Sequence, residues 1–159
     1  MKQMDSDGLW LCRMQGAMFQ ESLKTQESSS AVFIRRFMYS DLAERMDGGL
    51  FPYSSDPHVN EVLSSFGHRY GSEYYSAEEL YWIGYLYRYW SYTYEEPSKK
   101  IYRTCGAREM RSLYFPYHSL DPEAAIGRIL EAKGIHMETP EEEIERGVRI
   151  LREIMKMRI

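Results

Sequence analysis

Arg111 and His118 are the two residues whose types and spacing come nearest to a catalytic pair, with six residues between them. A histidine can accept and return a proton near neutral pH, and an arginine can stabilise the negative charge of a phosphate group. Together they could cleave a phosphodiester bond. Pro116 lies between them and predicts the end of a helix, so the two side chains need not share one helical face.

This spacing of arginine and histidine resembles that of helical ribonucleases of the HEPN class. The resemblance implies an RNA-cleaving enzyme in which Arg111 and His118 are the catalytic residues. The competing interpretation is that His118 and Asp121 cap and hydrogen-bond the turn that begins at Tyr117. We expect a protein without catalytic residues and keep the HEPN-like helical ribonuclease as an alternative.

Other catalytic classes lack the residues that they need. The histidines at positions 58, 68, 118 and 136 share no metal-ligand spacing, so we expect no metal site and no cofactor. The sequence holds no Gly-x-Ser-x-Gly motif, no phosphate-binding loop and no dinucleotide fingerprint. Cys12 and Cys105 are too few and too far apart for a disulfide scaffold, and we expect two reduced thiols.

A group of basic residues surrounds the turn formed by Cys105 and Gly106. Short helices predicted over 99–104 and 107–114 on either side of this turn give the outline of a helix-turn-helix. The cations could contact DNA phosphates, although the net charge of −4 gives the chain no general preference for nucleic acid. The alternative is therefore a DNA-binding regulator that uses Lys99, Lys100, Arg103 and Arg108.

The helix predicted over 77–94 carries eight aromatic residues and is apolar nearly all round, which indicates a central position in the fold. Gly84 would let another backbone approach it. Arg88 is the only formal charge between Leu80 and Tyr94, and a buried charge needs a partner. Two interpretations stay open: a core arginine bound to a carboxylate and to tyrosine hydroxyls, or an arginine that lines a pocket or partner groove with tyrosines.

Aromatic residues and arginine supply most of the strong contacts at protein–protein interfaces. The chain is rich in them, with 14 Tyr, 6 Phe and 3 Trp. We therefore expect a binding surface for another protein. Its candidate residues are Arg35, Arg36, Tyr81, Trp82, Tyr85, Arg88, Tyr92 and His118.

Apolar residues recur at helical spacing through the whole chain, and no alternating run predicts a strand. Capping residues, glycines and prolines mark the ends of the helices. The helices are predicted over 9–23, 31–46, 57–66, 77–94, 99–104, 107–114, 122–133 and 141–157. We expect an all-α protein, a compact bundle of about six to eight helices.

The sequence divides into a helical bundle core domain over 1–134 and a C-terminal amphipathic helix over 139–159. The apolar residues of this last helix follow a 4-3-4 spacing, so it can pack on its own bundle or dock on a partner. No apolar stretch is long enough to span a membrane, and the N-terminus lacks the layout of a signal peptide. We expect a cytoplasmic protein without a membrane partner.

Three strings of the sequence are distinctive: 31–38, 81–89 and 117–122. They resemble a family of small, all-helical bacterial proteins that are labelled antitoxin or uncharacterised and are encoded beside toxin genes. The similarity covers about residues 9–133, and the helix after Thr139 has no counterpart. The resemblance implies a non-catalytic antitoxin that binds and neutralises a cognate toxin protein. A homo-oligomer and operator DNA are further expected partners, since many antitoxins also repress their own operon.

Overall fold

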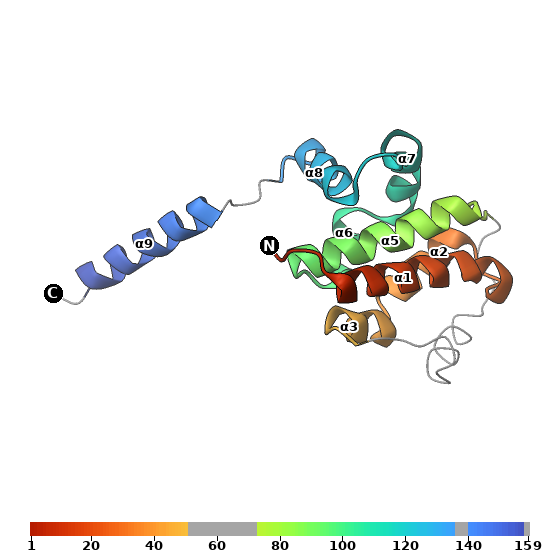
Figure 1. The fold of residues 1–159 in the computed structure, drawn as a ribbon, viewed down its shortest axis with the longest axis horizontal. Helices are drawn as coiled ribbons and strands as arrows, with labels where there is room; N and C mark the ends of the chain where they lie inside the picture. The colour runs from red at the N-terminus through yellow and green to blue at the C-terminus, as the bar shows by residue number, and fades with distance from the viewer. Residues whose placement is uncertain (51–72, 136–139, 158–159) are drawn as a thin grey trace. The chain divides into compact units, whose positions relative to one another are not determined.

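The computed structural model describes residues 1–50, 73–135 and 140–157, and in these ranges the chain forms eight α-helices and no strand (Figure 1). The all-α, multi-helix prediction is therefore confirmed. The helix predicted over 57–66 lies outside the described residues. The chain divides into two compact units, Met1–Ile126 and Gly127–Ile159.

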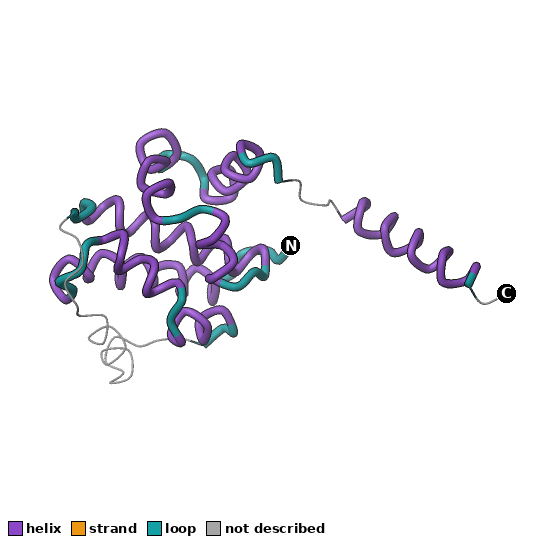
Figure 2. The backbone as a smooth tube through the Cα atoms, turned by 180° about the vertical axis from the view of Figure 1, so that it is seen from behind, coloured by secondary structure: helices purple, strands orange, loops and turns teal. Residues whose placement is uncertain are grey.

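Two long helices, α1 (Ser6–Thr25) and α5 (Ala77–Tyr94), lie side by side through the middle of the first unit (Figures 1 and 2). The predicted capping box starts α5. The backbone N–H of Glu79 donates to the Ser76 hydroxyl at 3.1 Å, and the backbone N–H of Ser76 donates to the Glu79 carboxylate at 3.0 Å. Helix α1 begins earlier than predicted, because Asp5 caps it by accepting a hydrogen bond from the backbone N–H of Gly8.

The two helices touch at Gly84, as its missing side chain led us to expect. A Cβ atom at this position would lie 2.7 Å from the carbonyl oxygen of Gln15 and 2.8 Å from the ring of Phe19. The side-chain amide of Gln15 also donates to the carbonyl oxygen of Gly84 at 3.0 Å. Close backbone contact and a buried hydrogen bond thus fix where α1 crosses α5.

The single helix predicted over 31–46 is wrong, because the chain forms two helices there, α2 (Ser30–Met38) and α3 (Asp41–Asp47). Ser40 separates them. Its hydroxyl accepts a hydrogen bond from the backbone N–H of Ala43 at 3.2 Å, which caps a new helix instead of continuing the old one. Helix α2 packs its phenylalanines against α1, where Phe19 makes edge contacts with the rings of Phe33 and Phe37 at 5.5 Å and 4.9 Å.

The two short helices around Cys105 and Gly106 are present as α6 (Ser98–Thr104) and α7 (Ala107–Tyr117). The expectation that Pro116 ends the second helix is wrong, since α7 runs through it to Tyr117. A proline so near the end of a helix removes only one backbone hydrogen bond, and the next turn still closes through the bond from the His118 N–H to the Tyr114 carbonyl at 2.8 Å.

The last two helices are α8 (Pro122–Ala132) and α9 (Pro140–Lys156). Helix α8 begins at the predicted proline and ends before Gly134, whose φ of 69° suits a residue without a side chain. Helix α9 lies wholly in the second unit. Among the described residues, none of the helices combines the length and the apolar character needed to cross a bilayer.

Candidate functional site

Arg88 lies inside the first unit with only 1% of its surface exposed, and internal acceptors use all of its N–H groups. Its Nε donates to Oε1 of Gln15 at 2.7 Å. One terminal nitrogen donates to Asp47 at 2.6 Å and to Ser91 at 3.4 Å. The other donates to the Ser98 hydroxyl at 3.1 Å and to the carbonyl oxygen of residue 43 at 3.5 Å. The guanidinium is therefore fully hydrogen-bonded within the fold.

This placement supports the first of the two interpretations of Arg88, a core arginine bound to a carboxylate. The acceptors are a carboxylate, an amide, two serines and a carbonyl, rather than the expected tyrosine hydroxyls. Burial lowers the pKa of Arg88, and the charge of Asp47 acts in the opposite direction. The expectation that Arg88 belongs to a partner-binding surface is corrected, because its side chain does not reach the surface.

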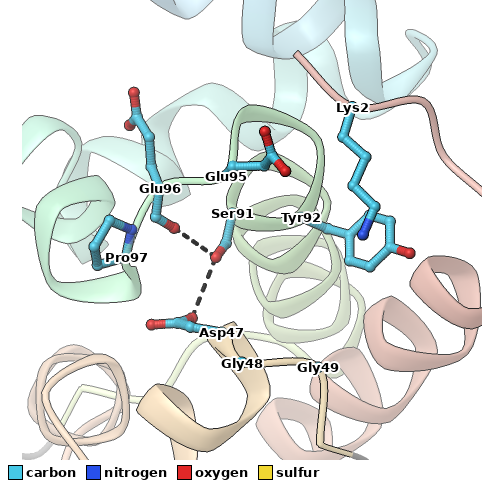
Figure 3. Close-up of a pocket in the computed structure, with 9 residues that line it drawn as sticks. All are labelled: Lys2, Asp47, Gly48, Gly49, Ser91, Tyr92, Glu95, Glu96 and Pro97. Carbon is cyan, nitrogen blue, oxygen red and sulfur yellow. Dashed lines mark hydrogen bonds between the residues drawn. The ribbon is translucent and has the colours of Figure 1, made fainter.

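A pocket of about 330 Å³ lies at the outer end of this network (Figure 3). The Ser91 hydroxyl donates to the carbonyl oxygen of Glu96 at 2.7 Å, and the ammonium group of Lys2 sits 4.0 Å from the centre of the Tyr92 ring. Asp47, on its wall, is already bound to Arg88. The polar groups in this pocket serve the fold, so we do not place the functional site here.

The stronger candidate is a second cleft on the first unit, of about 270 Å³, which we call the aromatic cleft. Helix α5 forms one side, and the residues around the end of α7 and the start of α8 form the other. Four of the predicted partner-binding residues come together in it. Its lining residues are Tyr81, Trp82, Tyr85, Leu86, His118, Leu120 and Pro122.

Packed rings hold the walls of the aromatic cleft. The ring of Trp82 meets that of Tyr114 edge-on at 5.8 Å, and Tyr114 stacks on His118 at 4.4 Å with only 16° between the ring planes. On the α5 side the rings of Tyr81 and Tyr85 lie 6.1 Å apart. The lining therefore consists of ordered, amphipathic side chains, which lose little conformational entropy when they bind.

Polar atoms are available at the cleft for directional contacts. Nδ1 of His118 lies 2.7 Å from the Tyr114 carbonyl oxygen, so it donates when it carries the proton and leaves Nε2 as an acceptor. Burial raises the pKa of Tyr85, so its hydroxyl stays protonated and can donate a hydrogen bond. Leu86 is 1% exposed and supplies an apolar floor.

The remaining predicted partner-binding residues lie outside this cleft. Arg35 is exposed on α2, and Arg36 beside it donates to the Ser28 hydroxyl at 3.2 Å. Tyr92 lines the pocket of Figure 3 instead, and its hydroxyl donates to Asp5 at 2.6 Å. Sequence reasoning missed Leu86, Leu120 and Pro122 as cleft residues, because apolar side chains at helical spacing look the same whether they fill a core or line a cleft.

The proposed catalytic pair is not brought together in the cleft. Arg111 pairs with Glu73 at 2.6 Å and with Glu79 at 3.2 Å, and its guanidinium lies 4.4 Å above the ring of Tyr75. Two carboxylates thus balance the charge that would have to hold a phosphate. Because α7 continues through Pro116, Arg111 and His118 lie on the same side of the helix after all, two turns and roughly 10 Å apart along its axis.

The four basic residues proposed for DNA contact are all exposed, on α6 and at the start of α7. Lys100 lies 3.5 Å from the Glu96 carboxylate, and Nε of Arg103 donates to the Tyr39 hydroxyl at 3.4 Å. The other two are Lys99 and Arg108. All four cationic side chains are therefore accessible to solvent.

Both cysteines are buried. Burial raises the pKa of the Cys12 thiol to about 12, so the thiolate that a nucleophile needs is absent at neutral pH. Among the residues that the structure describes, no three His, Cys, Asp or Glu side chains are grouped as metal ligands. No family model matches the chain, and comparison with curated proteins and with solved structures found no match either.

Proposed function

We propose that this chain is a non-catalytic, protein-binding antitoxin and that the aromatic cleft holds part of its cognate toxin. The observation that carries the proposal is the convergence of Tyr81, Trp82, Tyr85 and His118 in one open cleft. Tyrosine and tryptophan in a partly desolvated pocket are the residue types that supply most of the binding energy at protein interfaces.

The residues that line the cleft belong to two of the three strings that carry the family resemblance. Its lining residues on α5 all lie in the distinctive string 81–89, and those on its other side all lie in the string 117–122. The two strings are separated in the sequence, yet both contribute to a single surface feature. This coincidence supports a shared binding role for the two strings better than a purely structural one.

The chemistry of the cleft favours an apolar or aromatic anchor from the partner. Its floor is apolar at Leu86, and its rings can stack on or enclose an inserted side chain. His118 and Tyr85 can hydrogen-bond the polar rim of the same segment. Such an arrangement recognises a protruding hydrophobic side chain flanked by backbone polar groups.

The state of the candidate catalytic groups supports a role without catalysis. Arg111 is paired with two carboxylates, His118 is stacked on Tyr114, and Cys12 is buried in its protonated form. The charge of Arg111 is thus already paired, Arg111 does not line the cleft that holds His118, and Cys12 is not in the thiolate form that a nucleophile needs. We therefore favour binding over the ribonuclease alternative.

The test is co-expression with the product of the adjacent gene. We expect that product to arrest growth when it is expressed alone, and this chain to relieve the arrest and co-purify with it. Trp82→Ala should abolish the rescue, while Trp10→Ala, which removes a 44% exposed tryptophan outside the cleft, should keep it. A product that is harmless alone, or a full rescue by Trp82→Ala with its fold intact, contradicts the proposal.

A further inference from the structure

Helix α9 carries an apolar stripe that none of the described residues of its own unit covers. Ile144, Val148, Leu151 and Met155 follow the 4-3-4 spacing and are 66%, 41%, 60% and 68% exposed. Residues at this spacing lie on one side of a helix and form the seam of a two-stranded coiled coil. The stripe is thus shaped to receive a second helix of similar length.

The charges of α9 are divided between its two ends. Its first turn contains Glu141, Glu142 and Glu143, and its last turn contains Lys156. Glu145 and Arg152, seven positions apart, lie on the same flank of the apolar stripe, because seven residues make almost two full turns. The stripe therefore has an acidic flank near its start and a basic flank near its end.

We propose that α9 pairs in antiparallel orientation with α9 of a second copy of this chain. In an antiparallel pair, the flank that carries Glu145 and Arg152 in one helix lies against the same flank of the other helix. The start of each helix then lies beside the end of its partner. Glu145 then lies opposite Arg152 of the partner subunit, and the two-fold axis repeats this contact. In the apolar seam, Val148 lies against Leu151 of the partner subunit.

The charge pattern also selects this orientation over a parallel one. Parallel helices would place the acidic first turns of the two copies side by side, where like charges repel. Only the antiparallel arrangement sets opposite charges against each other on the flank that carries Glu145 and Arg152. Charge complementarity thus identifies a second copy as the occupant of the stripe.

Another occupant that an amphipathic helix could have is a lipid surface. Helices that lie on membranes carry an excess of lysine and arginine on their polar face. In α9 the five glutamates outnumber the four basic residues. The polar face of α9 therefore lacks the positive charge that binds anionic lipid, and a partner helix of mixed charge fits it better.

The experiment measures the oligomeric state of the full chain over a range of concentrations by analytical ultracentrifugation. We expect a monomer–dimer equilibrium, which Leu151→Glu abolishes. Glu145→Arg and Arg152→Glu should each weaken the dimer by about tenfold, since each replaces two attractive contacts by two repulsive ones. The double variant and an equimolar mixture of the two single variants should restore it.

Arg149→Glu is the matched control, because it makes the same charge change on the polar face of the same helix and should leave the dimer within about twofold. Circular dichroism checks that each variant keeps its helix content. A chain that stays monomeric at every concentration, with a melting temperature lowered by Leu151→Glu, shows α9 packed on its own chain and overturns the proposal. A dimer indifferent to Leu151→Glu, or to both charge reversals, overturns it as well.

Discussion

Arg88 and Asp47 form an ion pair of 2.6 Å although 41 positions separate them in the sequence. Asp47 ends α3, Arg88 lies in the middle of α5, and the same carboxylate accepts a hydrogen bond from the backbone N–H of Ser98 at the start of α6. One carboxylate therefore joins three helices. Gln15 extends the network to α1 through its bond to Arg88.

The first prediction concerns this ion pair. Asp47→Ala leaves the guanidinium of Arg88 buried without its counter-charge, and we expect the free energy of unfolding to fall by about 3 kcal/mol. Chemical denaturation measures the change. Asp41→Ala, which removes an exposed carboxylate from the same helix, should cost no more than about 1 kcal/mol. If both variants lost the same free energy of unfolding, the ion pair would contribute no more to stability than an exposed carboxylate does.

The second prediction concerns the crossing of α1 and α5. Gly84→Ala drives a methyl group into the backbone of α1, so we expect a loss of about 3 kcal/mol and a lower melting temperature. Gly127→Ala is the control, because nothing lies within 4 Å of the added atom and alanine is the better helix former. That variant should be as stable as the parent or more stable by up to about 1 kcal/mol. Equal shifts of the melting temperature in Gly84→Ala and Gly127→Ala would contradict the close contact of α1 and α5 at Gly84.

The boundaries of the helices show what sequence patterns could and could not determine. The capping box at Ser76 and Glu79 located the start of α5 because its signal is local. The division between α2 and α3 was missed, since Ser40 can occupy a helix interior or a cap, and tertiary packing decides between them. The predicted helix end at Pro116 was wrong for a related reason. The free-energy cost of a proline in a helix depends on how near it lies to the end of that helix.

The third prediction concerns acid sensitivity. Burial opposes ionisation of Glu79, but hydrogen bonds from Ser76 and Arg111 outweigh it and lower its pKa below the ordinary value of 4.5. A carboxyl with a lowered pKa stabilises the fold above its unfolded pKa, and this stabilisation is lost as the pH falls through the folded pKa.

Glu79→Gln should therefore reduce stability at neutral pH and flatten its decline below about pH 4.5. Thermal melts over a series of pH values measure both effects. Glu78→Gln, on the exposed neighbour in the same turn, provides the comparison. A decline below pH 4.5 that is as steep in Glu79→Gln as in the parent chain would rule out this role for Glu79.

The fourth prediction concerns the thiols. Cys12 and Cys105 are each 0% exposed, and burial raises the pKa of Cys12 to about 12, so neither should react with a thiol reagent at neutral pH in the native protein. Both should react after denaturation. Titration with a chromogenic disulfide counts the reactive groups. Rapid reaction of one thiol in the native chain, assigned with Cys12→Ser, would reveal an accessible nucleophile.

The candidate site was foreseen in part. The aromatic share of α5 pointed to Tyr81, Trp82 and Tyr85, and the structure gathers these three residues with His118 in one cleft. Arg88 was also assigned to this surface, because a charge in an apolar helix can line a groove as well as lie in a core. Only its long-range partners decide, and residues such as Asp47 and Gln15 are not connected to it by any sequence pattern.

The most direct test of the proposed binding role is the affinity of the purified chain for its cognate toxin, measured by isothermal titration calorimetry. Trp82→Ala should weaken binding by about thirtyfold or more, as expected for a residue at the centre of an interface, and Trp10→Ala should stay within about twofold of the parent. Equal affinities for the two variants, with both correctly folded, would contradict binding through the aromatic cleft.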